Sequence, residues 1–391
     1  MILAPSPKGR REFFSGLFGG GLRFHFMWTQ RKKWLVFLAL LAFAATFRIA
    51  VAHHWPNDSP DDGRVYAQIA RNVLEQHVYS HETEAPYDPS LIRLPGYPLF
   101  LAAIYKVFGH GNNGAVRIVQ ALIDTATCAL IALLAFYWQP DEKRKRATAL
   151  AALALAAVCP FTTIYAATIL TEVPTMFLAV AMCVAATVAF RKTFTTEDAE
   201  QSKDNTGFKH SLLWWLVSGL LGGLAVLLRP DSGLFAAAIG ITLAISGLAR
   251  FKESLRKTFT SCAIFSLAFV LVLVPWTVRN ARVFHLFQPL APAHGEMPGE
   301  FAPRGYSQWL RTWLDDERYI ASFLWSLDAE QITLNDVPPQ AFDSAEEKDR
   351  VAALLDQYNH PQGSATVSPS ASPQPVPSPS TTPQSEPNAS P

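Results

Sequence analysis

Seven apolar runs of nearly bilayer-spanning length constrain this chain more than any other feature of its sequence. A helix needs about 20 apolar residues to cross the hydrocarbon core of a membrane. The runs are Trp34–Ala52, Ile118–Trp138, Ala147–Tyr165, Val173–Phe190, Leu212–Leu228, Gly233–Ala249 and Phe259–Trp276. Because the apolar residues are bunched rather than spread as amphipathic stripes, we predict an all-α polytopic membrane bundle of about seven spans.

The composition of the 391 residues agrees with a membrane protein. Charged residues make up 17% of the chain, against about 25% in soluble globular proteins. This difference argues against a soluble α/β enzyme, and the apolar content argues against a wholly disordered chain. The net charge of +1 gives no sign of nucleic-acid binding. The four cysteines lie within or at the ends of apolar runs without a CxxC pattern, so we expect neither a disulfide framework nor a metal site.

Lys and Arg in the connecting loops predict the orientation, since positively charged segments resist translocation. Basic residues cluster before the first run and after the second, fourth and sixth. We therefore expect a multi-pass inner (plasma) membrane protein with a cytoplasmic N-terminus and an external C-terminus. The first run has no convincing cleavage site before it or after it, so we interpret it as a retained anchor.

This topology predicts four parts of the chain. They are a basic cytoplasmic leader (1–33), a membrane module (34–280) with an external loop (53–114), an external soluble segment (281–360) and a disordered Pro/Ser-rich tail (361–391). The run Tyr97–Phe108 is too short to span and is expected to be re-entrant or interfacial. Ser344 with Glu347 predicts a capping box at the start of a short helix.

Ionisable residues at several span ends fall on the external side and are candidates for one site. Asp61 and Asp62 begin an amphipathic stretch; periodicity favours a helix cap, and the alternative is a carboxylate acting as general base. Two interpretations are likewise open for three arginines: the side chain extends to the membrane surface from a helix end, or it binds a phosphate. They are Arg93, Arg229 and Arg279. Glu172 lies in a neighbouring external turn.

Other polar residues favour structural roles. Arg48, Gln120 and Asp124 lie inside apolar runs, where pairing between helices is the expected role. His53 and His54 have no recognised ligand spacing with Asp58, so no metal is assigned. The sequence has no Gly-rich phosphate loop, nucleophile elbow or HExxH motif, and no cofactor is expected.

An ordered set of short motifs resembles the GT-C membrane glycosyltransferases of the dolichyl-phosphate-mannose–protein mannosyltransferase and aminoarabinose-transferase group. The motifs are Asp62-x-x-x-Tyr66, Ala70-Arg71-Asn72, Pro95–Ala102, Thr171-Glu172, Leu228-Arg229-Pro230 and Pro275–Asn280. The resemblance covers roughly Trp34–Tyr358. The chain departs from this group in having fewer spans after the last motif.

The resemblance implies a GT-C-like bundle that transfers a sugar from a polyprenyl-phosphate donor to an acceptor hydroxyl, with inversion. It places the general base on Asp62, the donor phosphate on Arg229 and Arg279 with Arg93 as a weaker third ligand, and an orienting role on Glu172. The implied partners are the lipid-linked sugar, membrane lipid and an acceptor that is a protein, lipid or glycan. The alternatives are a transporter or flippase for lipid-linked saccharides and a non-catalytic assembly subunit.

Overall fold

The structure is a computed structural model that describes residues 30–56, 61–194, 206–249, 251–292, 297–298, 304–325 and 331–360. Most of the predicted leader and the whole predicted tail lie outside these ranges, as does Asp58. The chain divides into two compact units, Met1–Glu300 and Phe301–Pro391. Within the described ranges all regular secondary structure is helical.

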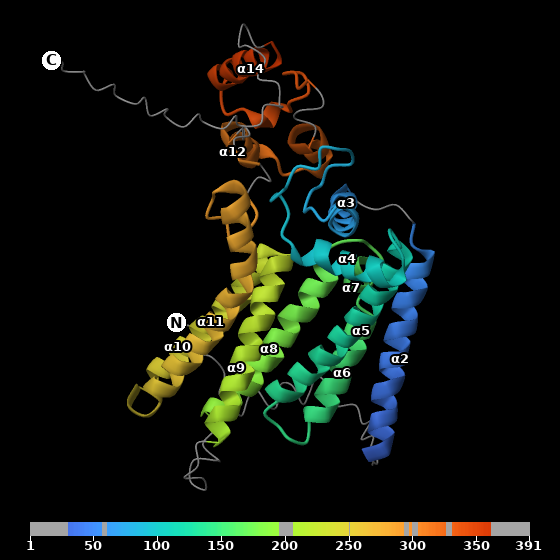
Figure 1. Cartoon of the computed structure of the whole chain (residues 1–391), viewed down its shortest axis with the longest axis vertical. Coiled ribbons are helices and arrows are strands. Elements are labelled where there is room, and N and C mark those ends of the chain that lie inside the picture. The colour runs from blue at the N-terminus through green and yellow to red at the C-terminus, as the bar shows by residue number, and fades with distance from the viewer. Residues whose placement is uncertain are drawn as a thin grey trace, which may run out of the picture. The chain divides into compact units, whose positions relative to one another are not determined.

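The first unit is a bundle of long helices (Figure 1). Its helices are α2 (Gln30–His54), α3 (Asp61–Glu75), α4 (Gly96–Phe108), α5 (Asn113–Trp138), α6 (Lys145–Ala157), α7 (Pro160–Ala166), α8 (Glu172–Phe194), α9 (Thr206–Leu228), η2 (Pro230–Ser232), α10 (Gly233–Ala249) and α11 (Phe251–Phe284). By length and composition, α2, α5, α8, α9, α10 and α11 can each cross a membrane, and the bent pair α6–α7 makes a seventh if it counts as one span. The predicted all-α polytopic fold is confirmed.

The third predicted span is broken rather than continuous. Helices α6 and α7 meet at 55°, and the break falls just before Pro160, which cannot donate a backbone hydrogen bond. The freed carbonyl groups of Ala156 and Ala157 each accept a 3.0 Å hydrogen bond from the guanidinium of Arg48 in α2. A break inside a membrane is tolerated where neighbouring helices satisfy the backbone in this way.

Arg48 also makes the ion pair that the sequence predicted between helices. Its Nε donates to Oδ2 of Asp124 in α5 at 2.6 Å, and both side chains are almost fully buried. In α5, Gln120 accepts a 2.7 Å hydrogen bond from the Tyr97 hydroxyl and donates to the Thr168 carbonyl at 2.6 Å. These buried bonds tie α2, α4 and α5 to the broken span.

Small residues let α9 pack closely between α8 and α11. A Cβ atom on Gly223 would lie 2.7 Å from the carbonyl oxygen of Phe269, and one on Gly222 would lie 2.9 Å from the sulfur of Met182. Close backbone approach of this kind stabilises helix pairs in lipid, where no hydrophobic driving force acts between them. The C-terminal end of α9, which carries Arg229, is thereby fixed to both neighbours.

The last span extends further than the sequence predicted. Helix α11 continues through Pro275 and past Trp276 to Phe284. The extension is held by Asn280, which is fully buried and donates to the carbonyl of Gln288 at 2.8 Å. This bond joins the end of α11 to the segment that follows it.

The second unit contains α12 (Arg304–Trp313), α13 (Glu317–Ile320), η3 (Ala321–Trp325), η4 (Pro339–Ala341) and α14 (Ala345–Asn359). It has its own apolar core, which includes Leu310, Trp313 and Phe323. The predicted capping box is confirmed in part: the Ser344 hydroxyl accepts from the backbone N–H of Glu347 at 3.1 Å, whereas the Glu347 carboxylate accepts from the N–H of Asp343 at 2.7 Å.

Candidate active site at one end of the bundle

The first ion pair of the candidate site joins α3 to the segment before α4. Asp62, in the first turn of α3, accepts a 2.6 Å hydrogen bond from Nη2 of Arg93. The side chains are 56% and 30% exposed, for Asp62 and Arg93 in that order, so water reaches the pair. An exposed pair of this kind contributes at most about 1 kcal/mol to stability. The Asp62–Arg93 pair therefore contributes little to the free energy of folding, and we consider it as part of a candidate functional site.

The second ion pair lies where α8 begins and α9 ends. Glu172, the first residue of α8, accepts from Nη1 of Arg229 at 2.7 Å. The Nε of Arg229 donates to Asp231 in η2 at 3.3 Å. Burial alone would lower the pKa of Arg229, but the hydrogen bond to Asp231 and the charge of Glu172 outweigh burial and raise it. Arg229 is therefore a permanent cation.

Tyr66 lies between the two ion pairs. It follows Asp62 by four residues, so both point from the same face of α3. Its ring packs edge-on against Tyr97, with centroids 5.2 Å apart, and lies 5.9 Å from the guanidinium carbon of Arg93. Burial raises the pKa of Tyr66; Arg93 and Arg229 lower it, and Asp62 and Glu172 raise it further. The charges of both ion pairs therefore act on the Tyr66 phenol.

Two polar atoms of the cluster are buried and lack a hydrogen-bond partner within the described residues. They are Oε2 of Glu172 and Nε of Arg93. Buried polar atoms without partners are rare because each costs about 1–3 kcal/mol. The cluster therefore retains one acceptor and one donor for a bound substrate.

Arg279 belongs to a neighbouring set of contacts. Its Nη1 donates to the Ser90 carbonyl at 2.7 Å and to Oδ1 of Asn280 at 2.9 Å. The guanidinium carbon lies 4.9 Å from the centroid of the Trp276 ring and 5.4 Å from that of Tyr79. Tyr79 in turn donates to the carbonyls of Arg93 and Leu94. Arg279 thus anchors the segment that presents Arg93, and its predicted role as a phosphate ligand stays a prediction.

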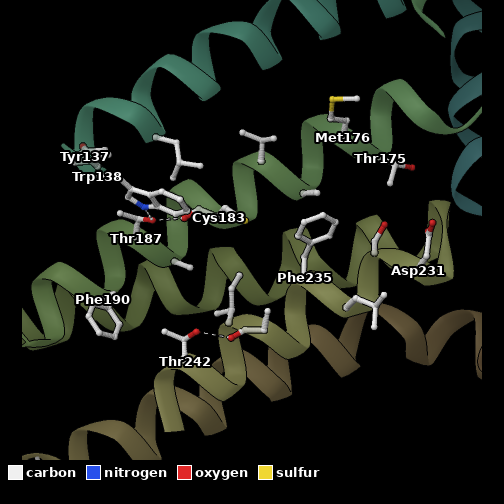
Figure 2. A pocket seen from close by; sticks show the side chains of 18 of the residues that line it. Tyr137, Trp138, Thr175, Met176, Cys183, Thr187, Phe190, Asp231, Phe235 and Thr242 are labelled. Atoms are coloured by element: carbon white, nitrogen blue, oxygen red, sulfur yellow. Dashed lines mark hydrogen bonds between the residues drawn. The ribbon is translucent and has the colours of Figure 1, made fainter. Parts of the chain in front are cut away.

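A long apolar groove begins at the second ion pair (Figure 2). Its volume is about 1240 Å³, and side chains of α5, α8, α9 and α10 line it. In Figure 2, Asp231 lies at one end of the groove and Trp138 lies at the other. Glu172 and Arg229 line the groove beside Asp231 through their ion pairs, and Arg191 lines it directly after Phe190 in α8. From Glu172 to Arg191, α8 rises by 19 residue steps or about 28 Å, which nearly matches the hydrocarbon thickness of a bilayer.

Gly96 couples α4 to the end of α9 that carries Arg229. A Cβ atom at this position would lie 2.6 Å from the carbonyl oxygen of Leu227 and 2.9 Å from the backbone nitrogen of Leu228. Backbone atoms cannot rotate away, so one helix must move. We expect Gly96→Ala to destabilise the bundle by about 1–3 kcal/mol and to reduce activity, measured by thermal unfolding and a sugar-transfer assay.

The control for this variant is Gly240→Ala. Gly240 lies inside α10 with no atom within 4 Å of the position its Cβ would occupy. Alanine there should be neutral or slightly stabilising, by up to about 1 kcal/mol. Equal unfolding temperatures for the two variants would contradict the role assigned to Gly96.

The structure brings Asp62, Arg93, Glu172 and Arg229 together, as the shared sidedness of their loops predicted. No role was predicted for Tyr66 or Asp231 from the sequence. The Asp-x-x-x-Tyr spacing could have indicated Tyr66, because residues four apart share a helix face. The sequence places Asp231 in the same external turn as Arg229, but their contact depends on the 3₁₀ turn that begins at Pro230.

The bundle defines a multi-pass membrane protein, and the polar cluster lies where several of its spans end. The family model for dolichyl-phosphate-mannose-protein mannosyltransferases matches residues 32–289. This match covers more than half of the chain, and the protein belongs to that family. The searches of curated proteins and of solved structures found no match.

Family membership makes the protein a membrane glycosyltransferase that uses a polyprenyl-phosphate-linked sugar as donor. The family transfers the sugar to a protein acceptor. The matched residues include every helix that contributes to the cluster and the groove.

Proposed function

We propose that the protein transfers the sugar from the donor lipid to an acceptor hydroxyl on the external membrane face, with inversion, and that Asp62 is the general base. The observation that carries this proposal is the meeting of two carboxylate–guanidinium pairs around Tyr66, with one pair at the mouth of a membrane-length groove.

The groove suits the donor lipid. Its lining is apolar over most of its length, as a polyprenyl chain requires, and its mouth carries the cation Arg229. A phosphate at this mouth would exchange the Arg229–Glu172 contact for a charge-assisted bond to its own oxygens. Arg93, with its unused Nε, is the second ligand in this proposal, and Arg279 supports it by fixing the preceding segment.

The transfer step needs one base and one stabilised leaving group. The acceptor oxygen attacks the anomeric carbon from the side opposite the phosphate and forms the new C–O bond. The bond from that carbon to the phosphate oxygen breaks, and its electron pair leaves with the polyprenyl phosphate. Asp62 takes the acceptor proton, while Arg229 and Arg93 stabilise the phosphate charge. The free Oε2 of Glu172 accepts a hydrogen bond from a substrate hydroxyl.

The proposed orientation in the membrane is supported by the loops at the end of the bundle opposite the cluster. The basic segment from Lys143 to Arg146 and the pair Arg191-Lys192 lie at the helix ends remote from Glu172. Positively charged loops favour the cytoplasm, which supports an external position of the cluster at the inner membrane. Labelling of a single cysteine introduced near Tyr66 with an impermeant reagent tests this assignment, and protection in intact cells would contradict it.

Arg229→Gln tests the phosphate site. Charge-assisted hydrogen bonds contribute about 1.5–3 kcal/mol, so we expect kcat/KM for the donor to fall about 10- to 100-fold. Arg229→Lys should recover part of this loss, because lysine restores the positive charge but lacks the planar guanidinium that donates two parallel hydrogen bonds. The measurement is transfer of label from radioactive polyprenyl-phosphate mannose by the purified protein.

The matched control for Arg229→Gln is Arg71→Gln. Arg71 lies on exposed α3 and donates to Gln68 at 2.8 Å, so its removal should leave donor kinetics unchanged. If the wild-type protein binds the donor but forms no glycosylated product with any acceptor, the transferase proposal fails and the assembly-subunit alternative gains support.

A further inference from the structure

A second cavity lies at the end of the bundle opposite the active site. Its volume is about 360 Å³, and it is formed by α2, α5 and α6, which lie side by side in Figure 1. The lining includes the apolar side chains of Phe37, Leu133 and Phe136. Trp34 and Arg146 contribute the only polar groups among the lining side chains. We call this cavity the α2–α6 slot.

The charge at the slot comes from Arg146. Its two nearest basic neighbours are already paired: Arg144 contacts Asp141 at 3.3 Å, and Lys145 forms an ion pair with Glu142. Arg146 makes no ion pair with any side chain that the structure describes, and it is exposed at the start of α6. An apolar cavity with one uncompensated guanidinium is complementary to an amphiphile with one negative group.

The surroundings of the slot favour a lipid over a soluble ligand. A site for a polar metabolite usually has several convergent polar groups that fix the orientation of the ligand. Here the lining offers one indole N–H and one guanidinium. Trp34 is 64% exposed at the start of α2, and tryptophan is typical of the headgroup level of a bilayer. Arg146 is therefore placed where a phosphate of the adjoining leaflet would lie.

We propose that the α2–α6 slot binds an anionic phospholipid of the cytoplasmic leaflet. One acyl chain fills the apolar cavity, and the phosphate accepts hydrogen bonds from the guanidinium of Arg146, which can donate in a bidentate manner. Basic pockets between spans on the cytoplasmic side are suited to anionic headgroups. The bound lipid would fasten α2 to α5 and α6, close to the buried contacts that hold the broken span.

Native mass spectrometry of the purified full chain tests this proposal, with phosphatidylglycerol and phosphatidylethanolamine added in separate titrations. We expect the wild type to retain phosphatidylglycerol in preference. Arg146→Gln should weaken that retention on the order of tenfold, since it removes charge-assisted bonds of at least about 1.4 kcal/mol. Arg144→Gln, whose guanidinium is paired with Asp141 and does not line the slot, should retain the lipid as the wild type does.

A second variant separates the slot from general surface charge. Ala129 lines the cavity and is partly buried, so Ala129→Leu should fill it and reduce lipid retention without changing any charge. Equal retention by Arg146→Gln and Arg144→Gln would overturn the proposal, and so would equal retention of the two lipids by the wild type. A photo-crosslinker at Leu150 that captures residues 1–29 instead of lipid would show that the leader is the occupant.

Discussion

Asp62→Asn is expected to lower turnover by about 10²- to 10⁴-fold, the range that a positioned general base contributes. The loss should fall on kcat, because asparagine can still occupy the site but cannot take a proton from the acceptor. Stability should change little, since the Asp62–Arg93 pair is exposed. Initial rates of label transfer at saturating donor, together with thermal unfolding, measure both effects.

A competing explanation is that Asp62 only positions Arg93, which it contacts at 2.6 Å. Arg93→Gln separates the two roles. If Asp62 acts only through Arg93, both single variants and the double variant should lose the same activity. If Asp62 is the base, Asp62→Asn should lose much more than Arg93→Gln. Glu75→Gln is the matched control, because Glu75 is an exposed carboxylate on the same helix, paired with His110 at 2.9 Å.

Arg48→Met should cost about 3–5 kcal/mol of the free energy of unfolding, as expected when one partner of a buried ion pair is removed. It would leave Asp124 unpaired in the bundle interior, together with the carbonyl of Ala157 at the break in the third span. The carbonyl of Ala156 would lose the Arg48 bond and keep a 3.3 Å bond from the backbone N–H of Cys159. The expected result is a large drop in unfolding temperature and in the yield of folded protein.

Asp124→Asn provides a graded comparison for Arg48→Met. Asparagine removes the charge of Asp124 but keeps an acceptor for Nε of Arg48, whose other guanidinium bonds to the broken span remain. Adding Asp124→Asn to Arg48→Met should recover part of the lost stability, since the buried carboxylate is then gone. If the double variant is no more stable than Arg48→Met, the carbonyls rather than the carboxylate account for the cost.

The sequence predicted the architecture of the first unit because apolar length is a local property of the chain. Each run of about 20 apolar residues specifies a membrane helix without reference to its neighbours. The same locality explains why helix α3 was predicted from its periodicity and why the cap at Ser344 was predicted from four residues. Helix α11 continues beyond the predicted span Phe259–Trp276 to Phe284, and near its end the buried Asn280 bonds the carbonyl of Gln288.

The composition of this sequence and the spacing of its apolar runs determined that the chain is a helical membrane protein. Its motifs indicated which side chains gather at one end of the helical bundle. The tertiary structure decided how they pair: Arg93 with Asp62, Arg229 with Glu172 and Asp231, and Arg279 with the backbone of a loop. Apart from the Arg229–Asp231 contact, whose partners are two positions apart, pairing depends on distances of a few ångströms between residues that are 31 to 189 positions apart. Only the packing of α3, α4, α8 and α9 fixes those distances, and no local pattern encodes them.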